Sequence, residues 1–101
     1  MMTVISTMKL RRGTEEEWDA AISQRFESAH DRPGWVSGQL LNPVDAPDTR
    51  VIVGTWRGRE DWEAWHNDPA FLDQRGKLED LLAEPNSVTW FEVVADARAA
   101  E

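Results

Sequence analysis

Few side chains in this chain could carry chemistry, and most of them gather in one short segment. The 101 residues include six tryptophans and two histidines but no cysteine and no tyrosine. These counts exclude disulfides, thiolate metal sites, a cysteine nucleophile and a phenolic acid or base, and two histidines cannot supply a three-histidine metal site. Residues 60–66 bring together Asp61, Trp62, Trp65 and His66. The residue types therefore favour proton transfer in an aromatic-lined site without a metal.

The charge of the chain narrows the choice of partners. Eleven basic and nineteen acidic residues leave a net charge of −8. Nucleic acid and an anionic membrane surface are poor partners for so acidic a chain, because both are bound mainly by basic side chains. No apolar run approaches the ~18 residues of a membrane span, and Arg11 and Arg12 follow the first apolar stretch, the reverse of a secretory signal. The absence of cysteine fits the reducing cytoplasm, where we expect the protein.

The hydrophobic pattern predicts a single domain, residues 1–101, with the element order β-α-β-β-α-β. Alternating apolar residues predict four strands, at 3–10, 35–41, 50–56 and 88–94. Helices are expected at 15–30, at 59–67 and from 69 to about 84. This order is the α+β, ferredoxin-like split βαβ arrangement, a four-stranded antiparallel sheet with the helical segments on one face. We expect an ordered core over about 3–94 and a frayed tail at 95–101.

Local signals predict where the helices begin. Thr14 and Glu17 have the spacing of a capping box. Gly58 is a tolerable N-cap, and Asp68 followed by Pro69 is a typical helix start. The first helix should bury one apolar stripe, made of Trp18, Ile22, Phe26 and Ala29.

The three later strands carry large apolar side chains on both faces. Simple alternation places Trp35 and Leu41 opposite Val36 and Leu40, Val51 and Val53 opposite Ile52 and Trp56, and Val88, Trp90 and Val94 opposite Phe91 and Val93. Helices can cover only one of these faces, and a small monomer does not normally expose the other. We therefore expect a twofold homodimer that packs sheet against sheet. The alternative is that some of these positions lie at strand ends, where alternation means little.

Over residues 3 to about 94 the chain resembles the antibiotic biosynthesis monooxygenases, a family of dimeric α/β-barrel proteins. The shared features are Pro-Gly before the second strand, a third strand that ends in Trp, and an acidic-aromatic helix: Pro33-Gly34-Trp35, Val51-Ile-Val-Gly-Thr-Trp56 and Glu60-Asp-Trp-Glu-Ala-Trp65-His66. The resemblance implies a dimeric α/β barrel. Family members include oxygenases of aromatic polyketides, quinol oxygenases, haem-degrading enzymes and proteins of no known activity.

The haem-degrading branch resembles this chain in its segment lengths. That branch uses a strand-one Asn, a helical Trp and a haem-ligand His nine residues later. Trp65 matches the Trp, whereas the other two positions carry Ser6 and Gln74. Glutamine is not a normal axial iron ligand, and His66 lies on a different helical face from Trp65. Haem is therefore the alternative cofactor, and weak haem binding is expected.

The polyketide-oxygenase branch resembles the chain through an Asn four residues before a helical Trp, a position that carries Asp61 here. This resemblance implies a cofactor-independent monooxygenase, in which an apolar aromatic substrate loses a proton and gives an electron to dioxygen. Trp65 is the expected hydrogen-bond donor, and Asp61 and His66 are the candidate proton acceptors. Ser6, Phe26 and Trp62 are the expected substrate-binding residues.

Each of these assignments has a structural alternative. Asp61 lies in the first turn of a helix, where acids are common because of the helix dipole. Trp62 and Trp65 have the spacing of a core stripe, and His66 fits a solvated histidine near a helix end. A non-catalytic, ligand-binding dimer is the third open function.

Overall fold

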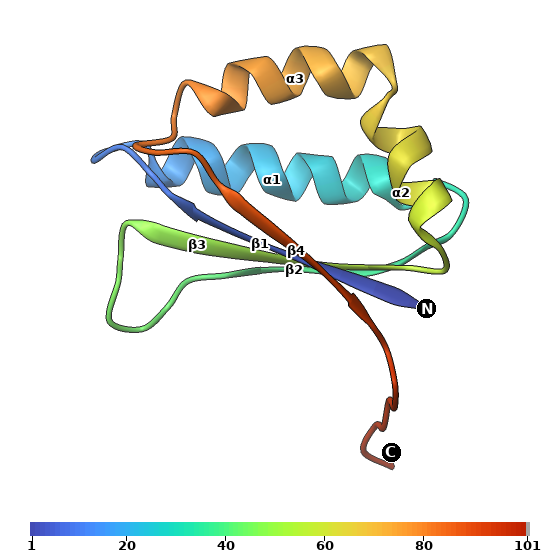
Figure 1. The fold of residues 1–101 in the computed structure, drawn as a ribbon. Coiled ribbons are helices and arrows are strands. Elements are labelled where there is room, and N and C mark those ends of the chain that lie inside the picture. The colour runs from blue at the N-terminus through green and yellow to red at the C-terminus, as the bar shows by residue number, and fades with distance from the viewer. Residues whose placement is uncertain (101) are drawn as a thin grey trace.

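The four strands pair into one antiparallel sheet, and the helices cover a single face of it (Figure 1). The computed structural model describes residues 1–100. The elements in chain order are β1 (Met2–Lys9), α1 (Glu15–Ala29), β2 (Trp35–Leu41), β3 (Thr49–Trp56), α2 (Arg59–His66), α3 (Pro69–Glu79) and β4 (Ser87–Glu92). The strand order β2-β3-β1-β4 confirms the predicted ferredoxin-like arrangement.

The strand register decides which side chains face the helices. On the central strand β1, Val4 and Met8 are buried on the helix-facing side. Ser6 lies between them on the same side, and its partners are Ile52 on β3 and Val88 on β4. Directly paired residues point to the same face of a sheet, so these side chains form the floor beneath the helices.

Strand β2 departs from simple alternation. Its register with β3 shifts directly after Trp35, which pairs with Trp56, whereas Leu40 pairs with Ile52. Trp35 and Leu40 therefore share the helix-facing side, and the prediction that placed them on opposite faces was wrong. The reason is a β-bulge, because one extra residue in a strand changes the parity of everything after it. Leu41 consequently lies on the far face, away from Trp35.

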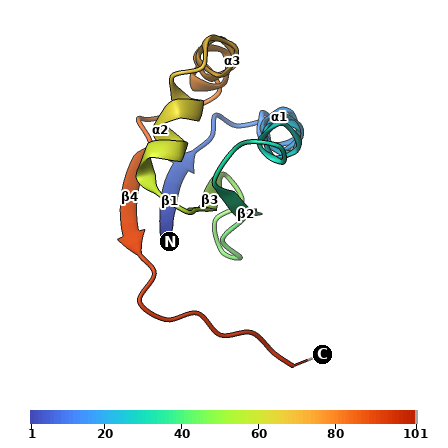
Figure 2. The same cartoon turned by 90° about the vertical axis from the view of Figure 1, so that its right-hand side faces the viewer.

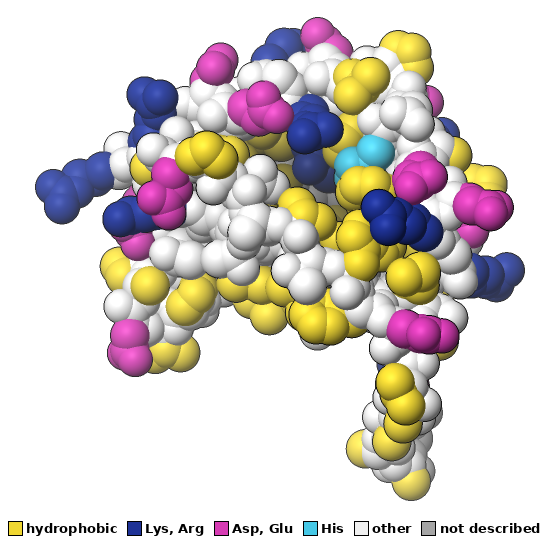
Figure 3. All heavy atoms as spheres, viewed as in Figure 1, with side chains coloured by type: hydrophobic (Ala, Val, Ile, Leu, Met, Phe, Trp, Pro, Cys, Tyr) yellow, Lys and Arg dark blue, Asp and Glu magenta, His cyan; other side chains and the backbone are white. Residues whose placement is uncertain are grey.

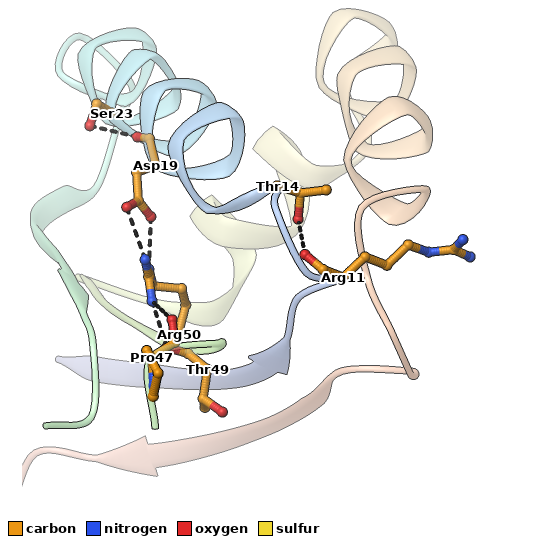
Figure 4. A network of polar contacts seen from close by, with 7 residues as sticks. All are labelled: Arg11, Thr14, Asp19, Ser23, Pro47, Thr49 and Arg50. Atoms are coloured by element: carbon orange, nitrogen blue, oxygen red, sulfur yellow. Dashed lines mark hydrogen bonds and ion pairs between the residues drawn. The ribbon is translucent and has the colours of Figure 1, made fainter. Parts of the chain in front are cut away.

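Helix α1 keeps its predicted apolar stripe and its predicted N-cap residue, Thr14, but not the predicted capping box. Trp18, Ile22 and Ala29 are buried, and the ring of Phe26 packs closely against the backbone of Gly38 on β2. The capping box was wrong. The Thr14 hydroxyl instead donates a 2.7 Å hydrogen bond backwards to the carbonyl of Arg11 (Figure 4).

Helix α3 begins where the sequence predicts and ends earlier than predicted. The carboxylate of Asp68 accepts a 2.9 Å hydrogen bond from the amide of Ala70, as expected of an N-cap. Helix α3 ends at Glu79 rather than near residue 84. The chain then turns, and Leu82 forms an isolated bridge with Leu10 just beyond β1. Pairing with the first strand thus replaces the expected last turn of the helix.

An ion pair that the sequence analysis did not anticipate holds α1 against the start of β3 (Figure 4). Arg50 is 6% exposed, and its Nε and Nη2 donate to the two carboxylate oxygens of Asp19 at 2.8 and 3.1 Å. Its Nη1 donates to the carbonyls of Pro47 and Thr49 at 2.9 and 3.0 Å. A buried guanidinium is tolerated here because each of its nitrogens has an acceptor.

No helix within residues 1–100 covers the far face of the sheet (Figure 2). Ile5 and Val53 form a pair there, Leu41 is 44% exposed and Phe91 is 46% exposed. Strand β4 ends at Glu92, two residues earlier than predicted. The chain beyond it leaves the body without regular structure (Figure 1), and Glu101, the end of the expected frayed tail, lies outside the described residues.

Candidate functional site

A cavity of about 170 Å³ lies between the helices and the sheet. Figure 3 shows the molecule hollowed there, with basic side chains and a histidine beside the hollow. Aromatic rings form a large part of the wall, and the tryptophans that line it are Trp18, Trp35, Trp56, Trp62 and Trp65. An apolar cavity of ~150 Å³ can hold benzene, so this one suits a ligand of one or two aromatic rings.

Helix α2 contributes Trp62, Trp65 and His66 to the cavity. Residues three and four apart lie on one side of a helix, which explains why Trp62 reaches the cavity together with the other two. The Trp65 ring packs 5.4 Å from the ring of Trp56 and 5.0 Å from that of Phe71. His66 also contacts the Trp65 ring edge-on at 5.5 Å. The structure therefore gathers Trp62, Trp65 and His66 at one cavity, although the sequence placed His66 on a different helical face from Trp65.

The imidazole of His66 is held in a defined state. Its Nδ1 lies 2.8 Å from the carbonyl oxygen of Trp62. A carbonyl only accepts, so Nδ1 carries the proton and Nε2 keeps a free lone pair. The pKa of His66 is lowered to about 4, mainly by burial and further by the charges of Arg25 and Arg75, although the Trp62 carbonyl opposes the shift. At neutral pH His66 is an uncharged imidazole with a basic nitrogen.

The other candidate base, Asp61, does not line the cavity. Its carboxylate lies against Gly34, in the space that a Cβ at that position would occupy. Gly34 has φ of +82°, a conformation that glycine adopts without strain. The spacing that suggested a shared face with Trp65 thus serves a contact between α2 and the start of β2.

Two of the predicted substrate-binding residues also reach the cavity. Ser6 on β1 is half-buried and lines its floor, and Phe26 on α1 lines its wall. Together with Trp62, Trp65 and His66 they make five of the six predicted site residues that meet at this cavity.

Arg25 also lines the cavity, although it was not among the residues predicted from the sequence. Its guanidinium lies 4.5 Å from the ring centre of Phe71, and its Nε and Nη2 are buried without an acceptor within residues 1–100. Burial, and to a lesser extent Arg75, lower the pKa of Arg25 to about 10. A signal was present in the sequence, because residue 25 continues the spacing of Trp18 and Ile22 and so interrupts a buried stripe with a cation.

The residues present fit a haem poorly. Gln74, at the expected ligand position, does not line the cavity and instead borders an open groove with Glu17 and Ala21 of α1. His66 is the imidazole at the cavity, but a volume of about 170 Å³ is far smaller than a porphyrin requires. Within residues 1–100 no group of three or more His, Cys, Asp or Glu side chains is placed to hold a metal ion, and no helix there is long and apolar enough to cross a membrane.

A sequence model of the antibiotic biosynthesis monooxygenase family matches residues 1–77. The chain belongs to this family. A relative from Mycobacterium tuberculosis, named as a mycobilin-producing haem oxygenase, is 29% identical over 92 residues, which cover 91% of this chain and 88% of the relative.

Solved structures of the family share the fold. A protein from Nitrosomonas europaea, named as an antibiotic biosynthesis monooxygenase, superposes with a TM-score of 0.86 at 21% identity and covers 94% of this chain and 100% of that one. SnoaB, a cofactor-independent oxygenase from Streptomyces nogalater, superposes with a TM-score of 0.83 at 18% identity, over 94% of each chain. At these identities the likeness is one of fold.

Proposed function

We propose that the protein is a cofactor-independent monooxygenase that oxidises a small hydroxyarene or quinol with dioxygen. The observation that carries this proposal is His66, an uncharged imidazole with a free Nε2 on the wall of an aromatic cavity. Such a group can take a proton from a bound phenol or activated methylene. The surrounding rings shield the resulting anion from much of the solvent.

The chemistry needs no further reductant. The substrate gives a proton to Nε2 of His66, and its anion transfers an electron to dioxygen. Recombination forms a carbon–oxygen bond as a hydroperoxide, and loss of water leaves a carbonyl. For a methylene substrate the balance is RH₂ + O₂ → R=O + H₂O, in which the substrate loses four electrons and dioxygen gains four. His66 returns its proton to the departing oxygen, and the Nε1–H of Trp65 donates a hydrogen bond to the substrate oxygen.

Oxygen uptake with a panel of one- and two-ring hydroxyarenes and quinols tests the proposal. His66→Gln keeps a neutral polar side chain but removes the base, and general-base catalysis typically contributes ~100- to 10,000-fold. We expect a fall in kcat of that order, whereas the matched His30→Gln variant should keep the wild-type rate, because His30 is exposed and does not line the cavity. Wild-type protein that consumes no oxygen with any substrate of the panel contradicts the proposal and favours a non-catalytic ligand binder.

We also propose that the protein acts as a homodimer through the far face of the sheet. Large apolar side chains, Ile5, Val53 and Phe91 among them, lie there without cover from a helix. On the same face the hydroxyls of Thr3 and Thr55 hydrogen-bond to each other at 2.9 Å, which reduces their need for water. A second copy of the sheet is the self-complementary partner that such a face suits.

Haem binding is the second candidate function, and the mycobacterial relative is the observation that favours it. Haem would supply iron-based oxygen activation, and His66 would be its ligand at the cavity. Titration with hemin, followed in the Soret region, separates the candidates. Weak binding that His66→Gln does not change supports the cofactor-independent proposal. A stoichiometric, sub-micromolar shift that His66→Gln abolishes and Gln74→Ala leaves intact supports the haem function.

A further inference from the structure

We propose that α1 carries an anion-recognition site in the cavity wall, where Trp18 and Arg25 select aromatic ligands that bear an anionic oxygen. This inference rests on the proposed function only for the reaction that follows ligand binding. The recognition itself is a separate property of the cavity and can be measured without turnover.

The first observation is a set of unused hydrogen-bond donors. Within residues 1–100, three buried side-chain nitrogens lack a partner, namely Nε1 of Trp18 and Nε and Nη2 of Arg25. All three are donors, and both residues line the cavity. Buried polar groups in folded proteins nearly always have partners, because an unmet one costs ~1–3 kcal/mol. An acceptor in the cavity, whether a water molecule or a ligand oxygen, would complete these donors.

The second observation is the charge at the cavity. Arg75 lines it too, but its guanidinium is paired with the carboxylate of Glu79 at 3.1 Å. His66 is uncharged at neutral pH. Within the described residues Arg25 has no such carboxylate, and its contact with the face of Phe71 holds the guanidinium in place without neutralising it. The titratable groups at the cavity thus leave about one unbalanced positive charge, which an anionic ligand would neutralise.

The third observation is the placement of the two donors. Trp18 and Arg25 are seven residues apart on α1, two turns along the same side of the helix. At 1.5 Å per residue, their backbones are separated by ~10 Å along the axis. Both side chains line the cavity from the same helix, so their donors can meet different oxygens of one bound ligand. A hydroxyquinone, which carries an ionised hydroxyl and two carbonyls on one ring, offers several such acceptors.

The two positions have a role beyond binding. After His66 takes a proton from a hydroxyarene, the negative charge remains on the substrate oxygen. Arg25 stabilises that anion, and together with burial, which is the larger cause, its charge lowers the pKa of His66 and keeps the imidazole neutral at pH 7. Arg25 is thus a specificity-determining residue for the proposed reaction.

Calorimetry with two quinones that are already oxidised tests the inference without turnover. The probes are 2-hydroxy-1,4-naphthoquinone, an anion at pH 7, and neutral 1,4-naphthoquinone, with wild type, Arg25→Met and the matched exposed control Arg12→Met. Because a charge-assisted hydrogen bond contributes ~1.5–3 kcal/mol, we expect wild type to prefer the anion by about tenfold or more. Arg12→Met should keep that preference, and Arg25→Met should lose it. Trp18→Phe should weaken both ligands by severalfold.

Thermal unfolding of the ligand-free proteins supplies a second readout. A guanidinium that only stabilises the fold would lower Tm when replaced, whereas an unpaired buried cation should leave Tm unchanged or raise it in Arg25→Met. Equal affinity for the two quinones, or a preference that survives in Arg25→Met, overturns the inference. If the protein prefers the anion but consumes no oxygen, the recognition site is supported and the proposed function is refuted. If it consumes oxygen but does not prefer the anion, the proposed function is supported and the recognition site is refuted.

Discussion

His66 stacks on Trp62, with ring centres 3.7 Å apart, and directs its Nδ1 to the carbonyl oxygen of that same residue. One turn of α2 therefore fixes both the orientation and the tautomer of the imidazole. Because the acceptor is a backbone atom, substitutions of the Trp62 side chain leave this hydrogen bond available. The basic nitrogen that remains, Nε2, is the atom on which the proposed chemistry depends.

Replacement of Trp65 by Phe should lower turnover while the fold is kept. Phe retains most of the packing against Trp56 and Phe71 and removes the Nε1–H donor. An oxyanion donor contributes ~100- to 1,000-fold in favourable cases, and in this partly open cavity we expect about 10- to 100-fold in kcat. Trp90→Phe is the matched control, because Trp90 does not line the cavity. Equal oxygen uptake by both variants would assign Trp65 to packing alone.

The activity should persist to unusually low pH. The pKa of His66 is lowered to about 4. The base therefore stays unprotonated at pH values at which an ordinary histidine, with a pKa of ~6.5, would become protonated and inactive as a base. We expect kcat/KM to be flat from pH 8 to about 5.5 and to decline toward pH 4. A decline centred near pH 6.5 would show that the imidazole is solvated in the working enzyme.

The free energy of unfolding should also depend on pH through His66. The unfolded chain takes up a proton on His66 near pH 6.5, and the folded chain only near pH 4. Stabilisation from the neutral imidazole is therefore complete above pH 6.5 and is lost as the pH falls toward 4. After allowance for its exposed edge, the loss should be ~1–2 kcal/mol. The free energy of unfolding, measured with urea at pH 7 and pH 4.5, should change less with pH for His66→Gln than for wild type. Comparison of the two proteins removes the contribution of the carboxylates, which titrate in both.

Removal of Asp19 should destabilise the protein more than removal of an ordinary surface acid. Asp19→Ala leaves the 6% exposed Arg50 without its carboxylate. Breaking a buried pair costs ~3–5 kcal/mol, but Asp19 is 41% exposed, so we expect ~1–3 kcal/mol. The control is Asp73→Ala, whose ion pair with Lys77 is exposed and should contribute less than ~0.5 kcal/mol. Equal urea midpoints for the two variants would contradict this prediction.

Two glycine substitutions should have opposite signs. Gly34→Ala adds a methyl group where the Asp61 carboxylate lies and at a positive φ, and we expect a loss of ~1–3 kcal/mol. Gly76→Ala adds a methyl group to open space within α3 and should gain ~0.4–1 kcal/mol. Thermal unfolding of both variants measures the contrast, and a destabilised Gly76→Ala would refute it.

A charge on the far face of the sheet should separate the proposed dimer. Light scattering of the wild type should give about twice the chain mass of 11.5 kDa, and Val53→Lys should give a monomer, because burial of an unpaired ammonium is strongly unfavourable. The control is Glu16→Lys, which changes the charge by more than Val53→Lys does but at an exposed position on α1. This variant should remain a dimer. A wild-type monomer with an ordinary melting curve would refute the dimer.

The sequence by itself determined the element order, the fold and most of the aromatic cavity wall. These features follow from short-range patterns, such as alternation along β1, the stripe of Trp18 and Ile22, and the Asp68-Pro69 helix start. Each acts within one strand or one turn, so its signal lies in neighbouring residues.

The tertiary structure decided which polar groups meet. Arg25 and Phe71 are 46 residues apart and touch only because α1 and α3 cover the same face of the sheet. The Asp61 carboxylate lies against Gly34 and away from the cavity because the start of β2 lies beside α2. The tautomer of His66 and the unpaired donors of Arg25 depend on burial and on contacts between distant segments. The spacing of residues within one helix or strand does not predict such burial or such contacts.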